Sequence, residues 1–261
     1  MTAHRSLGVP TAWGRGAIGA VVLFALLELL TRAELVTPSY LPPASDIVRE
    51  TVGLLGDGLF WEALGETMKA ALYGLLRAAV VAIPVGVLVG LFRWVRVAAM
   101  TVVEILRPLP SVALIPLAII VYGRGLEMKL FLVTFACLWP ILFNTVSGMQ
   151  AVDPVAVDTA RTFGLGRFAT AVRVQLRAAA PFIFTGVKIA ASIALILAVS
   201  AEIIAGGPRG GGLGIELQAA REIGDLQLSY AYTIMAGVVG VLLNMVFVAL
   251  ERRLFAWNVE D

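Results

Sequence analysis

Long apolar stretches separated by short polar segments dominate this chain. They predict six membrane helices near residues 15–33, 67–92, 97–122, 128–150, 179–205 and 230–251. Each stretch is close to the roughly 20 residues that cross the hydrocarbon core of a bilayer. Pro108, Pro110 and Pro116 interrupt the third stretch, and broken helices are tolerated at membrane depth where they pack in protein or line a cavity. We therefore expect an all-α membrane protein whose third span lies inside an assembly.

The composition agrees with this expectation. Of the 261 residues, 59% are hydrophobic and 15% are charged, with a mean hydropathy of +0.91, whereas soluble domains carry about 25% charged residues. The sequence has one cysteine, Cys137, and one histidine, His4, which argues against an internal disulfide and a Cys/His metal site. Residues 1–261 are interpreted as a single transmembrane domain.

The distribution of arginine predicts the orientation in the membrane. If the N-terminus is cytoplasmic, the inner segments contain Arg5, Arg15, Arg93, Arg96, Arg161, Arg167, Arg173, Arg177, Arg252 and Arg253. Cytoplasmic loops carry such an excess of basic residues. We expect both termini, including a tail over residues 1–14, on the cytoplasmic side of a bacterial inner membrane.

The outer segment over residues 34–66 has a pattern of its own. An extended Leu41–Ala44 stretch precedes Ser45 and Asp46, either of which is a suitable helix cap. Apolar positions from Ile47 to Trp61 then predict one amphipathic helix, which we expect at the outer membrane surface.

A short polar helix is predicted between the fourth and fifth spans, within a cytoplasmic segment over residues 151–178. Asp153 can accept hydrogen bonds from the first free N–H groups, and Pro154 suits the first helical position. Gly164 can adopt the left-handed conformation that ends a helix. A capped helix outside the bilayer indicates a docking surface, although a solvated helix at the membrane surface has the same caps.

The sequence contains no motif for catalysis or for nucleotide binding. The nucleotide-binding pattern G-x-x-x-x-G-K-[ST] is absent, and the glycine-rich stretch 206–214 is interpreted as a flexible outer loop. No set of Ser, His and Asp or pair of catalytic carboxylates stands out. We expect a non-catalytic chain, with no cofactor of its own, that is driven by an ion gradient or by a partner.

Polar side chains within the spans are candidates for a solute pathway, because they are costly in lipid. Glu202, Asn144, Arg107 and Ser200 are the candidates for a pathway or gate. For Glu202 the alternative is a hydrogen bond that holds the glycine-rich stretch. Arg77 and Glu104 are predicted to form an internal ion pair.

The capped helix and the segment that follows it resemble the cytoplasmic signature of permease subunits of bacterial ABC importers. The signature E-A-A, three residues, Gly, nine residues, I-x-L-P corresponds here to Asp158-Thr159-Ala160, Gly164 and Val174-Gln175-Leu176-Arg177. Arg177 replaces the proline, and Pro181 follows four residues later. Further matches to the nitrate/sulfonate/taurine branch are Leu41–Ala44, Arg107–Leu117, Tyr122–Gly125, Ala201–Glu202, Gly212–Gly214 and Leu250–Leu254, so that the resemblance covers nearly all of residues 38–255.

This resemblance implies a fold like that of type I ABC importer permeases, with a cytoplasmic coupling helix. The implied coupling residues are Asp158, Thr159, Ala160, Arg161, Gly164 and Arg167. The implied partners are a cytoplasmic ABC ATPase dimer that binds ATP and Mg²⁺, a second permease subunit in a homodimer, and an extracytoplasmic solute-binding protein. No nucleic acid is expected.

The resemblance indicates a small anionic solute such as a sulfonate, taurine or nitrate, with a vitamin precursor or an aromatic acid as alternatives. A gradient-driven secondary transporter or channel is the main alternative class. That class predicts inverted repeats and paired carboxylates within the membrane, and the sequence has neither. A membrane-embedded enzyme is a third possibility.

Overall fold

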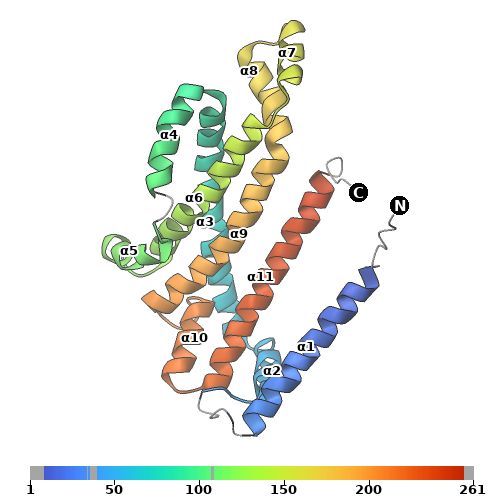
Figure 1. Cartoon of the computed structure of the whole chain (residues 1–261). Coiled ribbons are helices and arrows are strands. Elements are labelled where there is room, and N and C mark those ends of the chain that lie inside the picture. Colours follow the sequence, from blue (N-terminus) through green and yellow to red (C-terminus); the bar gives the residue numbers. More distant parts are fainter. Residues whose placement is uncertain (1–8, 34, 36–39, 107–108, 256–261) are drawn as a thin grey trace.

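The computed structural model describes residues 9–33, 35, 40–106 and 109–255. Every regular element in these ranges is a helix (Figure 1). The chain is therefore an all-α protein over the part that is described, as the apolar pattern predicts.

Three long helices form the central bundle: α3 (Gly58–Leu91), α6 (Leu126–Gln150) and α9 (Leu176–Ala205) (Figure 1). Small residues let their backbones approach closely, which is how helices pack when lipid supplies no hydrophobic driving force. A Cβ added to Gly74 would lie 2.5 Å from Val133 Cγ1, and one added to Gly186 would lie 2.7 Å from Asn144 Cβ. The α3, α6 and α9 backbones thus fit together only because these positions lack side chains.

Four described helices are long and apolar enough to cross a membrane: Gly58–Leu91, Leu126–Gln150, Arg167–Ala205 and Leu226–Leu254, the last being α11. They coincide with the predicted second, fourth, fifth and sixth spans, although the second begins at Gly58 rather than residue 67. The predicted first span, 15–33, coincides with α1 (Val9–Arg32), of which few side chains are described.

The predicted third span is not one continuous helix. It consists of α4 (Arg93–Leu106), the 3₁₀ turn η1 (Ser111–Leu114) and α5 (Ile115–Tyr122), and its two parts are bent by 76°. Pro110 precedes η1 and Pro116 stands in the first turn of α5. Because proline lacks an N–H and cannot continue a helix from the preceding turn, these residues divide the span.

The prediction of one amphipathic helix from Ile47 to Trp61 is wrong. Helix α2 (Ala44–Leu54) ends before Gly56, and Asp57 caps the next helix, α3, to which Trp61 belongs. The prediction of a cap at Ser45 or Asp46 is also wrong, because Pro43 occupies the N-cap and makes no side-chain hydrogen bond.

Glu28 of α1 takes the place of that cap. The backbone N–H of Ser45 donates to Glu28 Oε2 at 3.0 Å, and the Ser45 hydroxyl donates to Glu28 Oε1 at 2.9 Å. A carboxylate from another helix thus satisfies a free N–H in the first turn of α2, which an N-cap side chain would otherwise do.

The molecule has two distinct ends (Figure 1). Helices α7 (Pro154–Thr162) and α8 (Arg167–Thr170) lie at one end, and α2 and α10 (Leu213–Glu222) lie towards the other. Helix α1 runs away from the α7 end and α11 runs back towards it. The two ends therefore present different elements to the two sides of a membrane.

Candidate functional site

Helix α7 is capped at both ends as predicted. The Val155 N–H donates to Asp153 Oδ1 at 2.8 Å, and Pro154 occupies the first helical position. Gly164 has φ +81°, and the next N–H, that of Leu165, donates back to the Ala160 carbonyl at 3.1 Å. This backbone closure, which favours glycine at its left-handed position, makes α7 a short and rigid element.

The outward face of α7 and α8 exposes large apolar side chains among charged ones. Val155 is 69% exposed, Phe163 80% and Phe168 83%. A protein surface that exposes aromatic residues beside charges is typical of an interface. The exposed surface contributed by Val155, Phe163 and Phe168 is called the α7 docking face below.

The six predicted coupling residues divide into two groups. Asp158, Thr159, Arg161, Gly164 and Arg167 are exposed, whereas Ala160 is 9% exposed and packs α7 against the chain itself. Arg161 Nη1 lies 3.4 Å from Asp158 Oδ1, and both side chains remain accessible. Charges of both signs are therefore available to a partner beside the α7 docking face.

The connection from α7 to the membrane is helical. A π turn, η2 (Ala171–Gln175), joins α8 to α9, so that residues Arg167–Ala205 form one candidate span. Arg177, which replaces the signature proline, continues the first turn of α9, and Pro181 lies within the same helix. A continuous helical path therefore leads from α8 into α9, and the π turn and Pro181 are the places where it departs from regular hydrogen bonding.

Glu202 is the centre of a buried polar cluster near the end of α9. Its carboxylate accepts hydrogen bonds from Lys129 Nζ at 2.9 Å, from Thr67 Oγ1 at 2.9 Å and from the Gly214 N–H at 3.0 Å. The Glu202 side chain is 0% exposed and that of Lys129 6%. Buried charges are tolerated only when they are paired and hydrogen-bonded in this way. The cluster joins α3, α6, α9 and α10.

The interpretation of residues 206–214 as a loop holds only to Gly212, because α10 begins at Leu213, and hydrogen bonds hold this segment at several points. Lys129 Nζ also donates to the Gly211 carbonyl at 3.0 Å, and the Leu213 N–H donates to Thr67 Oγ1 at 2.8 Å. The Gly210 N–H donates to buried Glu216 at 2.7 Å, and α10 begins at Leu213. A Cβ on Gly212 would clash with the Glu202 carboxylate. The glycines therefore allow close approach of the backbone to two carboxylates.

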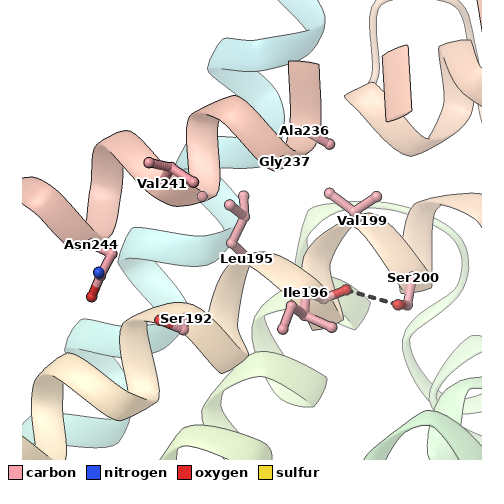
Figure 2. A pocket seen from close by; sticks show the side chains of 10 residues that line it. Ser192, Leu195, Ile196, Val199, Ser200, Ala236, Gly237, Val241 and Asn244 are labelled. Atoms are coloured by element: carbon pink, nitrogen blue, oxygen red, sulfur yellow. Dashed lines mark hydrogen bonds between the residues drawn. The ribbon is translucent and has the colours of Figure 1, made fainter. Parts of the chain in front are cut away.

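The predicted pathway residues do not share one pocket. Ser200 lines a pocket of about 510 Å³ between α9 and α11, the α9–α11 pocket, where its hydroxyl donates to the Ile196 carbonyl at 2.8 Å (Figure 2). Asn144 lines a pocket of about 620 Å³ between α6, α9 and α11, and Glu202 lines one of about 200 Å³ beside α10. Arg107 lies outside the described residues.

These features combine a short capped helix with exposed apolar residues at one end and pockets between membrane helices. Within the described residues, no group of three or more His, Cys, Asp or Glu side chains could hold a metal ion. A family model described as "Binding-protein-dependent transport system inner membrane component" matches residues 82–256. The chain belongs to this family.

Curated relatives of this permease cover most of its length. It is 29% identical over 244 residues to the taurine transport system permease protein TauC of Escherichia coli, an alignment that covers 92% of this chain and 88% of TauC. It is 30% identical over 201 residues to the bicarbonate transport system permease protein CmpB of Synechococcus elongatus, covering 77% and 71%. The chain is therefore a permease subunit of an ABC importer, a non-catalytic transport subunit that works with an ATPase and a solute-binding protein.

A solved structure supports the same fold. The permease matches a chain of the inward-facing MetNI methionine ABC transporter with a TM-score of 0.64 and 18% identity, which covers 75% of this chain and 95% of the other. At this identity the likeness shows the fold alone, which is that of type I importer permeases.

Two features of the permease escaped prediction from sequence. Phe163 and Phe168 were not among the predicted coupling residues, although two phenylalanines in an otherwise polar segment are themselves a signal. The predicted pair of Arg77 with Glu104 is wrong, because Arg77 Nη1 lies 3.2 Å from Glu127 Oε2 instead. Glu127 is in the first turn of α6, which packs along α3.

Proposed function

We propose that this permease carries a small oxyanion into the cell as one of two identical subunits, with a cytoplasmic ATPase dimer docked on α7. The names of two relatives, which specify taurine and bicarbonate, support this class of solute. Both compounds carry a compact oxygen-bearing anionic group. A solute-binding protein on the outer side delivers the solute.

The proposed orientation has α7 and both termini in the cytoplasm. The positions of the arginines support it, and so does the arrangement of α1 and α11, whose first and last turns point towards the α7 end (Figure 1). Only 6% of the most apolar window of α11 is buried within the described chain, so most of this helix is open to lipid, to the solute or to the second permease copy.

The α7 docking face is the observation that carries the coupling mechanism. ATP and Mg²⁺ bind to the ATPase dimer, whose closure draws the two α7 helices together. Phe163 and Phe168 anchor each α7 in a groove of the ATPase, since aromatic residues contribute much of the affinity at such interfaces. The continuous Arg167–Ala205 helix then transmits the displacement to the pockets beside α9.

The first experiment identifies the solute. The complete complex is reconstituted in proteoliposomes with its binding protein, and uptake and ATP hydrolysis are measured with taurine, bicarbonate, nitrate, a vitamin precursor and an aromatic acid. We expect an oxyanion to stimulate both activities. Stimulation by a neutral or aromatic solute alone would contradict the proposed solute class.

The second experiment tests α7 as the coupling element through Gly164→Pro. Proline fixes φ near −65°, whereas Gly164 has φ +81°, so the variant should uncouple ATP hydrolysis from uptake while the subunit still inserts. Gly224→Pro is a matched control, because Gly224 has φ +80° and ends α10 at the opposite end of the molecule. Normal uptake by Gly164→Pro would refute the proposed role of α7.

A further inference from the structure

The α9–α11 pocket is apolar except at three positions. Aliphatic and small residues dominate its lining, the polar members are Ser192, Ser200 and Asn244, and no charged side chain lines it. Its volume of about 510 Å³ lies within the roughly 300–1,000 Å³ of small-molecule sites. The pocket thus has the size and chemistry for a small solute that is recognised by hydrogen bonds alone.

Two of the three polar side chains have no hydrogen-bond partner among the described residues. Ser192 and Asn244 are exposed, and neither makes a hydrogen bond within the part of the chain that the structure describes, whereas Ser200 donates to the Ile196 carbonyl. Both lie within candidate membrane spans, where lipid offers no hydrogen-bond partner. Polar groups in this position face a water-filled cavity or another protein surface.

The two unpaired groups come from different helices and lie towards the same end of the pocket. Figure 2 shows Ser192 on α9 and Asn244 on α11 there, with Ser200 towards the other end. The hydroxyl of Ser192 and the amide of Asn244 both offer donors. One small ligand with several oxygen acceptors can therefore bridge α9 and α11.

We propose that Ser192 and Asn244 form a transit site, at which the transported oxyanion accepts hydrogen bonds from both side chains as it crosses the membrane. This inference rests on the proposed function. Neutral donors suit a transit site, because passage requires binding that is favourable enough for entry and weak enough for release. A lysine or arginine in the same place would hold an anion more strongly and slow its departure.

A second copy of the chain is the competing occupant of this face, since asparagine side chains also join membrane helices by interhelical hydrogen bonds. The accessibility of introduced cysteines distinguishes a solute site from a contact with a second copy. Cys137 is the single cysteine of the sequence and is buried, so that Ser192→Cys or Asn244→Cys reports on its own position. Leu242→Cys is the matched control, because Leu242 is 55% exposed on α11 but does not line the pocket.

The complete complex in proteoliposomes is treated with a membrane-impermeant methanethiosulfonate reagent that carries a sulfonate. We expect Ser192→Cys and Asn244→Cys to react at rates that differ about tenfold or more between the nucleotide-free and ATP-bound states, since alternating access changes the exposed population. Leu242→Cys should stay unmodified in both states. Absence of labelling of Asn244→Cys in both states, or equal labelling rates in the two states, would overturn the proposal.

Uptake measurements test the hydrogen-bonding role. Asn244→Asp places a negative charge against the oxyanion and should lower uptake of taurine and bicarbonate about tenfold or more, whereas Asn244→Gln keeps the donors and should retain most of it. Equal uptake by these two variants overturns that role. If the wild-type complex takes up none of taurine, bicarbonate and nitrate, the proposed solute class fails, and the labelling still decides whether the pocket lies on the pathway.

Discussion

Lys129→Met tests whether the buried cluster around Glu202 holds the segment 206–214 in place. The substitution removes the ammonium group that pairs with Glu202 at 2.9 Å and donates to the Gly211 carbonyl at 3.0 Å. Methionine keeps a similar unbranched side chain, so the change is mainly electrostatic. The Glu202 carboxylate then retains only Thr67 and the Gly214 N–H as donors.

The expected loss of stability is large because both side chains are almost inaccessible, at 6% and 0% exposure. Removal of one partner of a buried ion pair costs about 3–5 kcal/mol. Two neutral donors remain on Glu202, so we expect a value near the lower limit, about 3 kcal/mol. For a chain of this size, that corresponds to a decrease in Tm of about 6–12 °C.

Two assays measure this effect on the complex in lipid nanodiscs. Thermal unfolding gives the change in Tm, and tryptic cleavage after Arg209, which is exposed in the same segment, reports local release. The double variant Lys129→Met/Glu202→Gln removes both charges, and we expect it to be more stable than the sum of the single effects predicts, by about 2 kcal/mol. Strict additivity, or a Tm decrease below about 2 °C for Lys129→Met, would refute a structural role for this ion pair.

Two further predictions concern α3 and the α7 docking face. Gly74→Ala should lower the Tm of the complex, because the new Cβ would lie 2.5 Å from Val133 Cγ1. Gly65→Ala on the same helix meets nothing within 4 Å and should stabilise the complex by up to about 1 kcal/mol, so equal effects of the two variants would contradict the close packing of α3 on α6. Phe168→Ala should weaken binding of the ATPase about tenfold or more, measured by titration in nanodiscs, whereas Ile223→Ala, which truncates another exposed apolar side chain at the opposite end, should leave binding unchanged. Similar binding by both variants would exclude Phe168 as an anchor.

Local sequence signals predicted those features that depend on neighbouring residues. The caps of α7 are an example, because Asp153 and Gly164 act on N–H and carbonyl groups within a few residues of themselves. The apolar stretches predicted the long helices for a related reason, since a span must satisfy its own backbone within lipid. The signature around Gly164 also identified the family, and the match of the family model to residues 82–256 confirms it.

Features that depend on contacts between distant residues were decided by tertiary structure. The α2 cap was mispredicted because its partner, Glu28, belongs to another helix. The segment 206–214 is held by Thr67 and Lys129, which stand far away in sequence and meet Glu202 only when α3, α6 and α9 pack together. Asn244 and Ser192 likewise come to one pocket only because α9 and α11 lie against each other.

The sequence alone thus determined that the chain is a helical permease with a short capped helix at α7, because composition, turn chemistry and a local signature suffice for that. Tertiary structure decided which polar groups are paired and which are free, since burial and distance between helices set the partner of each side chain. Glu202 accepts hydrogen bonds from Thr67, Lys129 and Gly214 near the end of α9, whereas Asn244 lines a pocket and has no partner among the described residues. The sequence shows Glu202 and Asn244 only as polar residues in apolar stretches, so it could not predict which of them is paired.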